Sequence, residues 1–248
     1  MENPLHPFEL HPLVQVSLFG VDISLNKAVL MMWVVLALVS ALLLLAASSR
    51  RLVPTKLQSL AEIFVEFIRG MILDIIGKQG MRFFPFIATL FLFILFCNLV
   101  GLVPGSYTVT SQIVVTAAFA LFVYGMSLVV GFVLHGVKFL GILVPAGTPM
   151  WMLPLMIPIE VVSQLARPLS LAVRLFANIT AGHTVLAVLF GMALSLPLLI
   201  GWLPFVVTVG INGLEVFIAF IQAYIFTILT CVYLGDAITL HGHEQHAH

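Results

Sequence analysis

The sequence predicts an all-α polytopic membrane protein. Of its 248 residues, 62% are hydrophobic and only 8% are charged, whereas a soluble domain is about 45–50% apolar and about 25% charged. The mean hydropathy is +1.20, and apolar runs of about 20 residues, long enough to cross a bilayer, recur along the chain. This composition excludes a soluble globular protein, a nucleic-acid-binding protein and a disordered chain. The net charge is zero and indicates nothing about partners.

The chain is expected to begin with an arm, residues 1–26, on the outer side of the membrane. This arm has no basic start and contains Glu2, Glu9 and Asp22, so it does not have the pattern of a cleavable signal. The first apolar run, residues 28–47, is long enough to cross the membrane as one helix.

Residues 54–77 predict a different kind of helix. Glu62, Glu66 and Arg69 recur at helical spacing, and large apolar side chains fill the other side. This pattern predicts an amphipathic helix that lies at the membrane interface or against a partner helix.

Two further apolar runs, residues 83–103 and 113–134, predict a helical hairpin that crosses the membrane twice. Cys97 and Cys231 both lie inside apolar runs. We interpret them as small buried hydrophobic residues and not as a disulfide or a metal-binding pair.

Residues 155–240 hold two long apolar segments, about 155–197 and 203–240. Each would measure roughly 55–65 Å as one helix, but the hydrocarbon core is only about 30 Å thick. Each segment must therefore break into two short helices, bend, or run strongly tilted. The link between them, residues 198–204, is short and apolar, and this favours a tilted hairpin inside the membrane.

The basic residues predict the orientation of the chain. Arg50, Arg51 and Lys56 lie in the first loop, and Lys138 follows the 113–134 helix, whereas the opposite side has only Lys27, at the end of its arm. Because cytoplasmic loops carry an excess of Lys and Arg, we expect the N-terminus outside and, after five spans, the C-terminus in the cytoplasm.

Between residues 141 and 234 only four side chains are charged by default: Glu160, Arg167, Arg174 and Glu215. Each costs several kcal/mol in a bilayer unless it is paired or lines water. The cost indicates a purpose, which is either a buried structural ion pair or a path for ions.

The spacing of these charges is regular. Glu160, Arg167 and Arg174 are seven residues apart and form one stripe on a helix, and Gln164 and Asn178 lie near the same stripe.

Glu215, Gln222 and Asp236 are separated by seven and fourteen residues, with Asn212 one turn before Glu215. Two helices that present these polar stripes to each other would enclose a wettable path.

His183 lies nine residues after Arg174, about half a turn away around an ideal helix. It does not share the face of the arginine unless Gly182 distorts the helix, and it can instead face the second helix. Carboxylates, imidazole and amides relay protons, whereas an arginine, with a pKa above about 12, does not. Acids on both sides of an arginine therefore indicate two half-paths that a barrier separates.

Four segments together resemble one family: Ile159–His183, which contains Arg-Leu-Phe-Ala-Asn, Glu215–Leu234, Phe96–Pro104 and His135–Phe139. They are similar to subunit a of F-type ATP synthases, most closely to its mitochondrial and alphaproteobacterial branch. The resemblance covers nearly the whole chain from about residue 5.

The resemblance implies roles for single residues. Arg174 matches the essential arginine that faces a carboxylate of the c-subunit ring. His183 and Glu215 match a pair that lines the outer half-channel, and we place Asn212 beside them. The remaining assignments are Asn178 and Gln222 near the arginine, Glu160 and Asp236 on the cytoplasmic side, and Arg167 and Gln164 in a structural or path role.

The resemblance also implies a proton-translocating stator subunit with no nucleotide site of its own. Its implied partners are the c-subunit ring, the peripheral-stalk b-subunits, the remainder of the complex and the lipid bilayer, and no cofactor, metal or nucleic acid is expected. The implied location is a bacterial inner membrane, with the mitochondrial inner membrane as the alternative.

The His-rich tail, residues 241–248, either binds metal adventitiously or is a solvated tail. A secondary transporter, an intramembrane hydrolase and a structural anchor fit the residues less well, because repeats and a nucleophile arrangement are not evident in the sequence.

Overall fold

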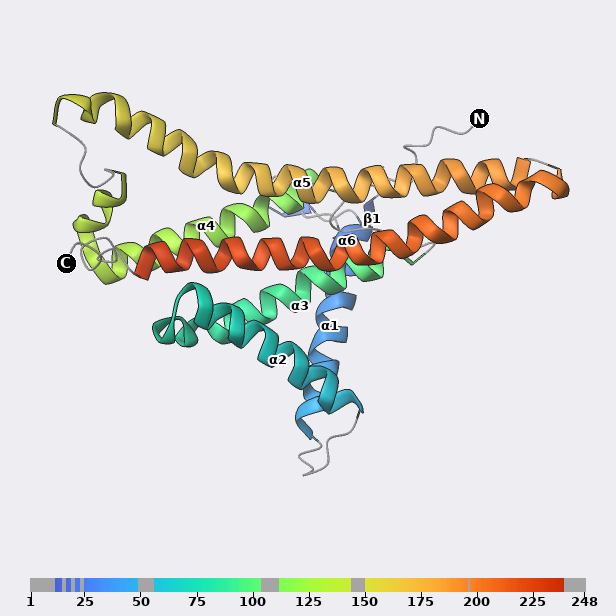
Figure 1. The fold of residues 1–248 in the computed structure, drawn as a ribbon, viewed down its shortest axis with the longest axis horizontal. Helices are drawn as coiled ribbons and strands as arrows, with labels where there is room; N and C mark the ends of the chain where they lie inside the picture. The colour runs from blue at the N-terminus through green and yellow to red at the C-terminus, as the bar shows by residue number, and fades with distance from the viewer. Residues whose placement is uncertain are drawn as a thin grey trace.

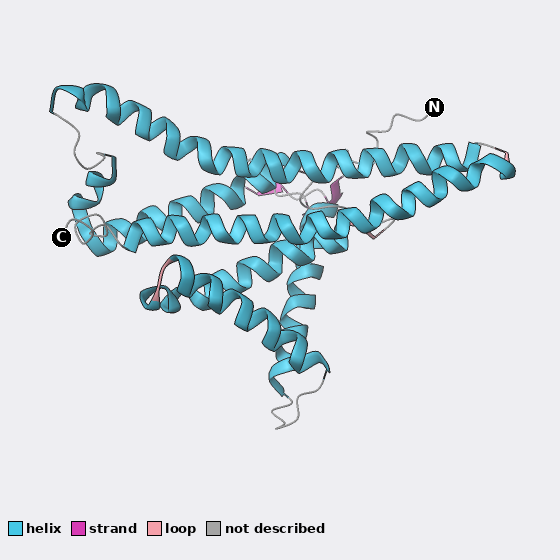
Figure 2. Ribbon diagram, viewed as in Figure 1, coloured by secondary structure: helices cyan, strands magenta, loops and turns pink. Residues whose placement is uncertain are grey.

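The computed structural model describes residues 12–14, 17–18, 21–22, 25–48, 56–103, 112–143, 150–195 and 197–238. This part of the chain is almost entirely helical (Figure 2). Its α-helices are α1 (Lys27–Ser48), α2 (Lys56–Ile75), α3 (Phe84–Gly101), α4 (Ile113–His135), α5 (Leu153–Ser195) and α6 (Leu198–Ile238). Short 3₁₀ helices are η2 (Lys78–Phe83), η4 (Gly136–Leu143) and η5 (Met150–Met152). The His-rich tail lies outside the described residues.

The expected N-terminal arm contains short strands that the sequence analysis did not predict. β1 (Pro12–Val14) pairs with β4 (Leu25–Asn26), and β2 (Ser17–Leu18) pairs with β3 (Val21–Asp22), both antiparallel. Each strand has only two or three residues, too few to show the alternation of polar and apolar residues that identifies a strand.

Five helical segments are long and apolar enough to cross a membrane, which confirms the predicted number of spans. They are Lys27–Leu45, Lys78–Gly101, Ile113–Phe139, Leu153–Ser195 and Gly201–Ile238.

Helix α2 is not among these segments, as its polar stripe predicted. Glu62, Glu66 and Arg69 are exposed, whereas Ile68 and Ile72 on its other side are buried. The helix therefore packs one apolar side against the rest of the protein.

Helices α5 and α6 are each continuous, with 43 and 41 residues. Pro158 and Pro168 lie inside α5 and Pro204 inside α6, so each proline removes a backbone hydrogen bond without ending its helix. Figure 1 shows the two helices side by side along the longest axis of the molecule, with α5 curving away toward its N-terminal end. Of the three alternatives that the sequence left open, a break into two short helices does not occur.

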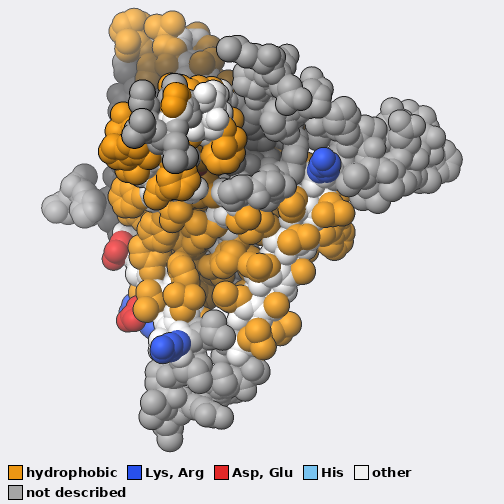
Figure 3. All heavy atoms as spheres, turned by 90° about the vertical axis from the view of Figure 1, so that its right-hand side faces the viewer, with side chains coloured by type: hydrophobic (Ala, Val, Ile, Leu, Met, Phe, Trp, Pro, Cys, Tyr) orange, Lys and Arg blue, Asp and Glu red, His pale blue; other side chains and the backbone are white. Residues whose placement is uncertain are grey.

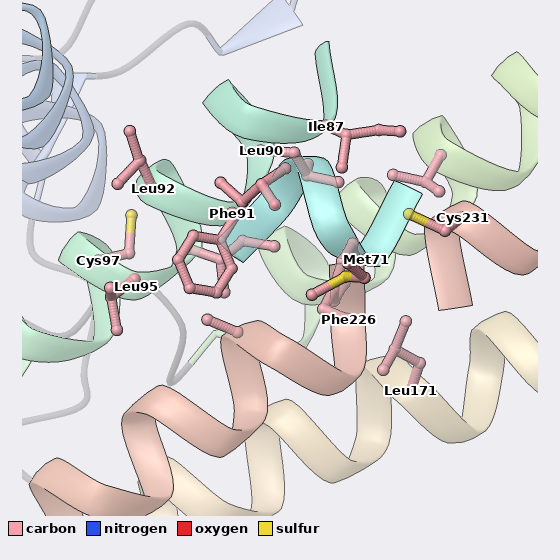
Figure 4. Close-up of a cluster of buried hydrophobic side chains, with 14 of the residues drawn as sticks. Met71, Ile87, Leu90, Phe91, Leu92, Leu95, Cys97, Leu171, Phe226 and Cys231 are labelled. Carbon is pink, nitrogen blue, oxygen red and sulfur yellow. The ribbon is translucent and has the colours of Figure 1, made fainter. Parts of the chain in front are cut away.

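The core lies around α3 and α6 (Figure 4), where α3 packs against α1, α2 and α6, and α6 packs against α2, α4 and α5. Phe91 and Phe226 are fully buried there, and the ring of Phe91 meets that of Phe220 edge-on at 6.0 Å. Cys97 and Cys231 are buried and free, which confirms that they are small hydrophobic residues of the core.

The outer surface is also apolar. Figure 3 shows a face on which most of the described side chains are hydrophobic and few are charged. Val114, Val133 and Leu194 are more than 70% exposed, as expected for side chains that meet lipid or a neighbouring subunit.

Candidate functional site

Glu215 is the buried acid of the long helix α6. Its side chain is 8% exposed, and neither carboxylate oxygen has a hydrogen-bond partner among the described residues. A buried carboxylate without a partner costs several kcal/mol. This group is therefore placed to exchange a proton or to receive a ligand atom.

Gly182 of α5 makes room for this carboxylate. A Cβ atom built on Gly182 would overlap Oε1 of Glu215 and lie 2.9 Å from its Cδ. Only a glycine lets the backbone of α5 approach the acid so closely. His183 follows Gly182 directly in α5, so its backbone lies near the level of Glu215. The side chain of His183 is outside the described part, and its pairing with Glu215 stays a prediction.

Arg174 lies on a different side of α5 from the core. Its side chain is exposed, whereas Leu171 and Leu175 are buried and lie about 60° and 100° away from it around the helix, so Arg174 lies at the edge of the buried face. Among the described residues Arg174 has no ion pair or hydrogen bond. A cation in this apolar helix therefore has its charge directed away from the rest of the described chain.

The two polar stripes do not face each other in the way that the sequence analysis expected. Glu215 and Gln222 are buried, but Arg167 and Arg174 are exposed. The physical reason is the apolar content of α5, because Leu171, Leu175 and their neighbours occupy the buried face and displace the arginines to its edge.

Two buried amide side chains, those of Asn98 and Gln222, lie near Glu215 along α6. Asn98 of α3 is fully buried and donates Nδ2–H to the Ala219 carbonyl at 3.5 Å, and its Oδ1 has no partner among the described residues. Gln222 is 2% exposed, and its Nε2 also lacks one there. Since residues 215, 219 and 222 share one side of a helix, Asn98 lies between the levels of Glu215 and Gln222.

Sequence reasoning missed Asn98 as a site residue. The available signal was a single amide inside the apolar α3 segment, since a polar side chain in a span is expensive and faces the interior of the bundle.

The other end of the helix pair has a cleft of about 280 Å³, which Gln164 of α5 and Asp236 of α6 both line. Gln164 donates Nε2–H to Oε1 of Glu160 at 3.0 Å. The structure thus brings Glu160, Gln164 and Asp236 to one region. The assignment of Glu160 and Asp236 to the cytoplasmic side stays a prediction.

Two tyrosines and a serine line this cleft and were also missed. Tyr124 and Tyr233 meet edge-on with ring centroids 5.9 Å apart, Ser127 lies beside them, and Arg167 is within electrostatic range of both rings. Tyr233 precedes Asp236 by three residues, so the helical spacing could have indicated it.

Two predicted site residues remain without a structural role. Asn178 and Asn212 are half-buried, and neither side chain bonds to another described residue. Within the described ranges no group of three or more His, Cys, Asp or Glu residues could hold a metal ion.

The fold and site define a polytopic membrane protein in which buried polar atoms beside the long helix α6 have no hydrogen-bond partner among the described residues. The family model for the ATP synthase A chain matches residues 29–235. A relative from Magnetococcus marinus is 50% identical over 245 residues, covering 96% of this chain and 94% of that protein. Relatives from Rhodospirillum rubrum (46% over 241 residues; 97% and 100%) and Rhizobium johnstonii (48% over 247 residues; 97% and 99%) are also named ATP synthase subunit a. The chain belongs to the ATP synthase A chain family, which confirms the resemblance in the sequence motifs.

Proposed function

We propose that this chain is the proton-translocating stator subunit in the membrane sector of an F-type ATP synthase. The relatives are bacterial proteins named ATP synthase subunit a, and together with the five candidate spans they support a location in the bacterial inner membrane. Its N-terminus then lies in the periplasm and its C-terminus in the cytoplasm. Nucleotide chemistry belongs to other subunits of the complex.

Protons enter from the periplasm along α6. Glu215 accepts them together with His183 and Asn212, and Asn98 and Gln222 offer hydrogen bonds further along the same side. Support comes from the burial of Glu215 and from the unpaired polar atoms of Asn98 and Gln222. Water can satisfy both atoms, because it accepts a hydrogen bond from Nε2–H of Gln222 and donates one to Oδ1 of Asn98.

Protons leave to the cytoplasm through the cleft that Gln164 and Asp236 line, past Glu160. The hydrogen bond between Gln164 and Glu160 holds that acid at the level of the cleft. Tyr124 and Tyr233 contribute hydroxyl groups to the walls of this exit.

Arg174 separates the two paths. The observation that carries this proposal is that the arginine is exposed and has no partner among the described residues, while Glu215 is buried and also without one. The cation and the acid of this chain therefore do not neutralise each other. A carboxylate of a neighbouring c-subunit supplies the missing negative charge, and as the ring turns each c-subunit in succession presents its carboxylate to Arg174.

The chemistry of the passing carboxylate follows from this charge. A nearby cation lowers the pKa of a carboxylate, so the ring acid releases its proton as it arrives at Arg174. Because a guanidinium does not give up a proton near neutral pH, protons do not cross directly between the half-channels. The test is proton flux in vesicles that contain the whole complex, measured for wild type and for Arg174→Ala.

The peripheral-stalk b-subunits hold this chain against rotation. The amphipathic helix α2, which presents Glu62, Glu66 and Arg69 outward, is a suitable contact for them at the cytoplasmic interface. Copurification of the chain with the c-ring and b-subunits tests these partners.

A further inference from the structure

A cleft of about 720 Å³ lies between η2, α4 and the C-terminal end of α6, and it shares no lining residue with the cleft of the proposed proton exit. Lys78 and Arg82 of η2 line it together with Val129 and Val133 of α4. Figure 1 shows that η2 and the C-terminal ends of α4 and α6 lie toward the same end of the molecule.

The end of this cleft is held by a tertiary hydrogen bond. His135, the last residue of α4, donates Nε2–H to the Ile238 carbonyl at the end of α6, with a distance of 3.2 Å. Both residues line the cleft, so this bond fixes α4 and α6 relative to each other at its wall.

Both cations of the cleft are available to a ligand. Lys78 and Arg82 are exposed, and neither forms an ion pair with a described residue. The cleft has no Asp or Glu among its described lining residues. The nearest acid along the chain, Asp74, lines a different cleft together with Glu66.

The opposite wall is apolar and faces outward. Val129 and Val133 are 62% and 78% exposed and belong to a segment that is long and apolar enough to span the membrane. Lys78 and Arg82 lie at the start of another such segment, where a helix end meets the headgroup layer. The cleft thus combines two cations at headgroup level with valines at the level of acyl chains.

We propose that this cleft binds an anionic phospholipid, with its phosphate between Lys78 and Arg82 and an acyl chain along Val129 and Val133. Basic pockets between transmembrane helices on the cytoplasmic side favour such headgroups, and Arg and Lys form charge-assisted hydrogen bonds to phosphate. A free phosphate would use only the cations, and a neutral lipid would use only the apolar wall. The proposed lipid site uses none of the residues assigned to the proton path.

The test uses the intact complex in nanodiscs and a phosphatidylglycerol probe with a photoreactive group on its acyl chain. In wild type the label is expected on residues 129–134. Each cation contributes about fivefold to the affinity, so Lys78→Gln with Arg82→Gln lowers it roughly 30-fold. Lys138→Gln removes an exposed charge from the neighbouring η4, outside the cleft, and serves as the matched control with unchanged labelling.

Three results overturn the proposal. Equal labelling of residues 129–134 by a phosphatidylcholine probe means that the cations do not select the lipid. Full displacement of the anionic probe by inorganic phosphate means that the site takes a free anion. Labelling of the isolated full chain but not of the complex means that a partner subunit covers the cleft. If the double variant does not assemble, the single variants Lys78→Gln and Arg82→Gln are measured instead. Each lowers the affinity for the probe about fivefold, while Arg82→Lys keeps most of the labelling.

Discussion

Adding a single methyl group at Gly182 displaces the acid of the proposed outer path. A Cβ atom there would overlap Oε1 of Glu215 and lie 2.9 Å from Cδ, where ordinary contact begins at 3.4 Å. In Gly182→Ala the carboxylate must therefore retreat by at least about 0.5 Å at Cδ, and by more at its oxygen. Since the Glu215 side chain is flexible, we expect overpacking to cost only about 1–3 kcal/mol of stability.

The effect on proton transfer is larger than the effect on stability. A misplacement of about 1 Å in a reacting group can reduce a rate by roughly 100-fold. We therefore expect Gly182→Ala to slow ATP synthesis and ATP-driven proton pumping by roughly 10-fold or more. The assay is ΔpH-driven ATP synthesis in proteoliposomes, together with a count of assembled complexes.

Gly191→Ala is the matched control, because Gly191 also lies in α5 but has nothing within 4 Å of its added Cβ. Combining Gly182→Ala with Glu215→Asp shortens the acid by one methylene and should restore part of the rate. The reasoning fails if Gly182→Ala and Gly191→Ala have equal rates at equal assembly.

Three further predictions concern other parts of the chain. Glu215→Gln removes a proton acceptor while nearly keeping the shape of the side chain, so ATP synthesis and proton uptake should slow with normal assembly. Exchanging the pair (Glu215→His with His183→Glu) should recover more activity than either of these two changes alone. Wild-type rates in both single variants would exclude the proposed outer path. Asn98→Leu keeps the branched shape of the side chain but removes the bond to the Ala219 carbonyl and the Oδ1 acceptor. Proton uptake should therefore fall at normal assembly, and unchanged uptake would remove Asn98 from the path. Cysteines at positions 62 and 69, in place of Glu62 and Arg69, should react with membrane-impermeant thiol reagents added on the cytoplasmic side. If these cysteines react from neither side in a preparation without partner subunits, α2 is a sixth spanning helix.

The sequence predicted the spans because the length of an apolar run directly reflects the thickness of the bilayer. The same argument separated α2 from the spans by its polar stripe. It left the form of α5 and α6 open, because Pro158, Pro168 and Pro204 are compatible with a break or with a continuous helix. The short strands of the arm were missed because strands of two or three residues carry no readable alternation.

The candidate site was predictable where charge lies in an apolar segment. Glu160, Arg174, Glu215 and Asp236 stand out in this way. Packing was not predictable: the sequence does not show that Gly182 meets Glu215, or that Arg174 turns outward while Gln222 turns inward. These orientations depend on which side of each helix packs against the other helices, and the sequence alone does not determine that packing.

The central claim is that Arg174 meets a carboxylate of another subunit and blocks direct proton flow. Arg174→Ala removes the cation, and Arg174→Lys keeps a charge but loses the planar fork and loses its proton more readily when desolvated. Both variants should be severely impaired. Lys56→Ala, which removes an exposed cation of α2, is the control and should remain near wild type.

The most direct measurement is proton flux in vesicles with and without the soluble ATPase sector, made alongside ATP synthesis on the same Arg174→Ala preparation. The account predicts that synthesis and ATP-driven pumping both stop, and that protons leak passively between the half-channels once the barrier is gone. Coupled ATP synthesis at a near-normal rate in Arg174→Ala would contradict it.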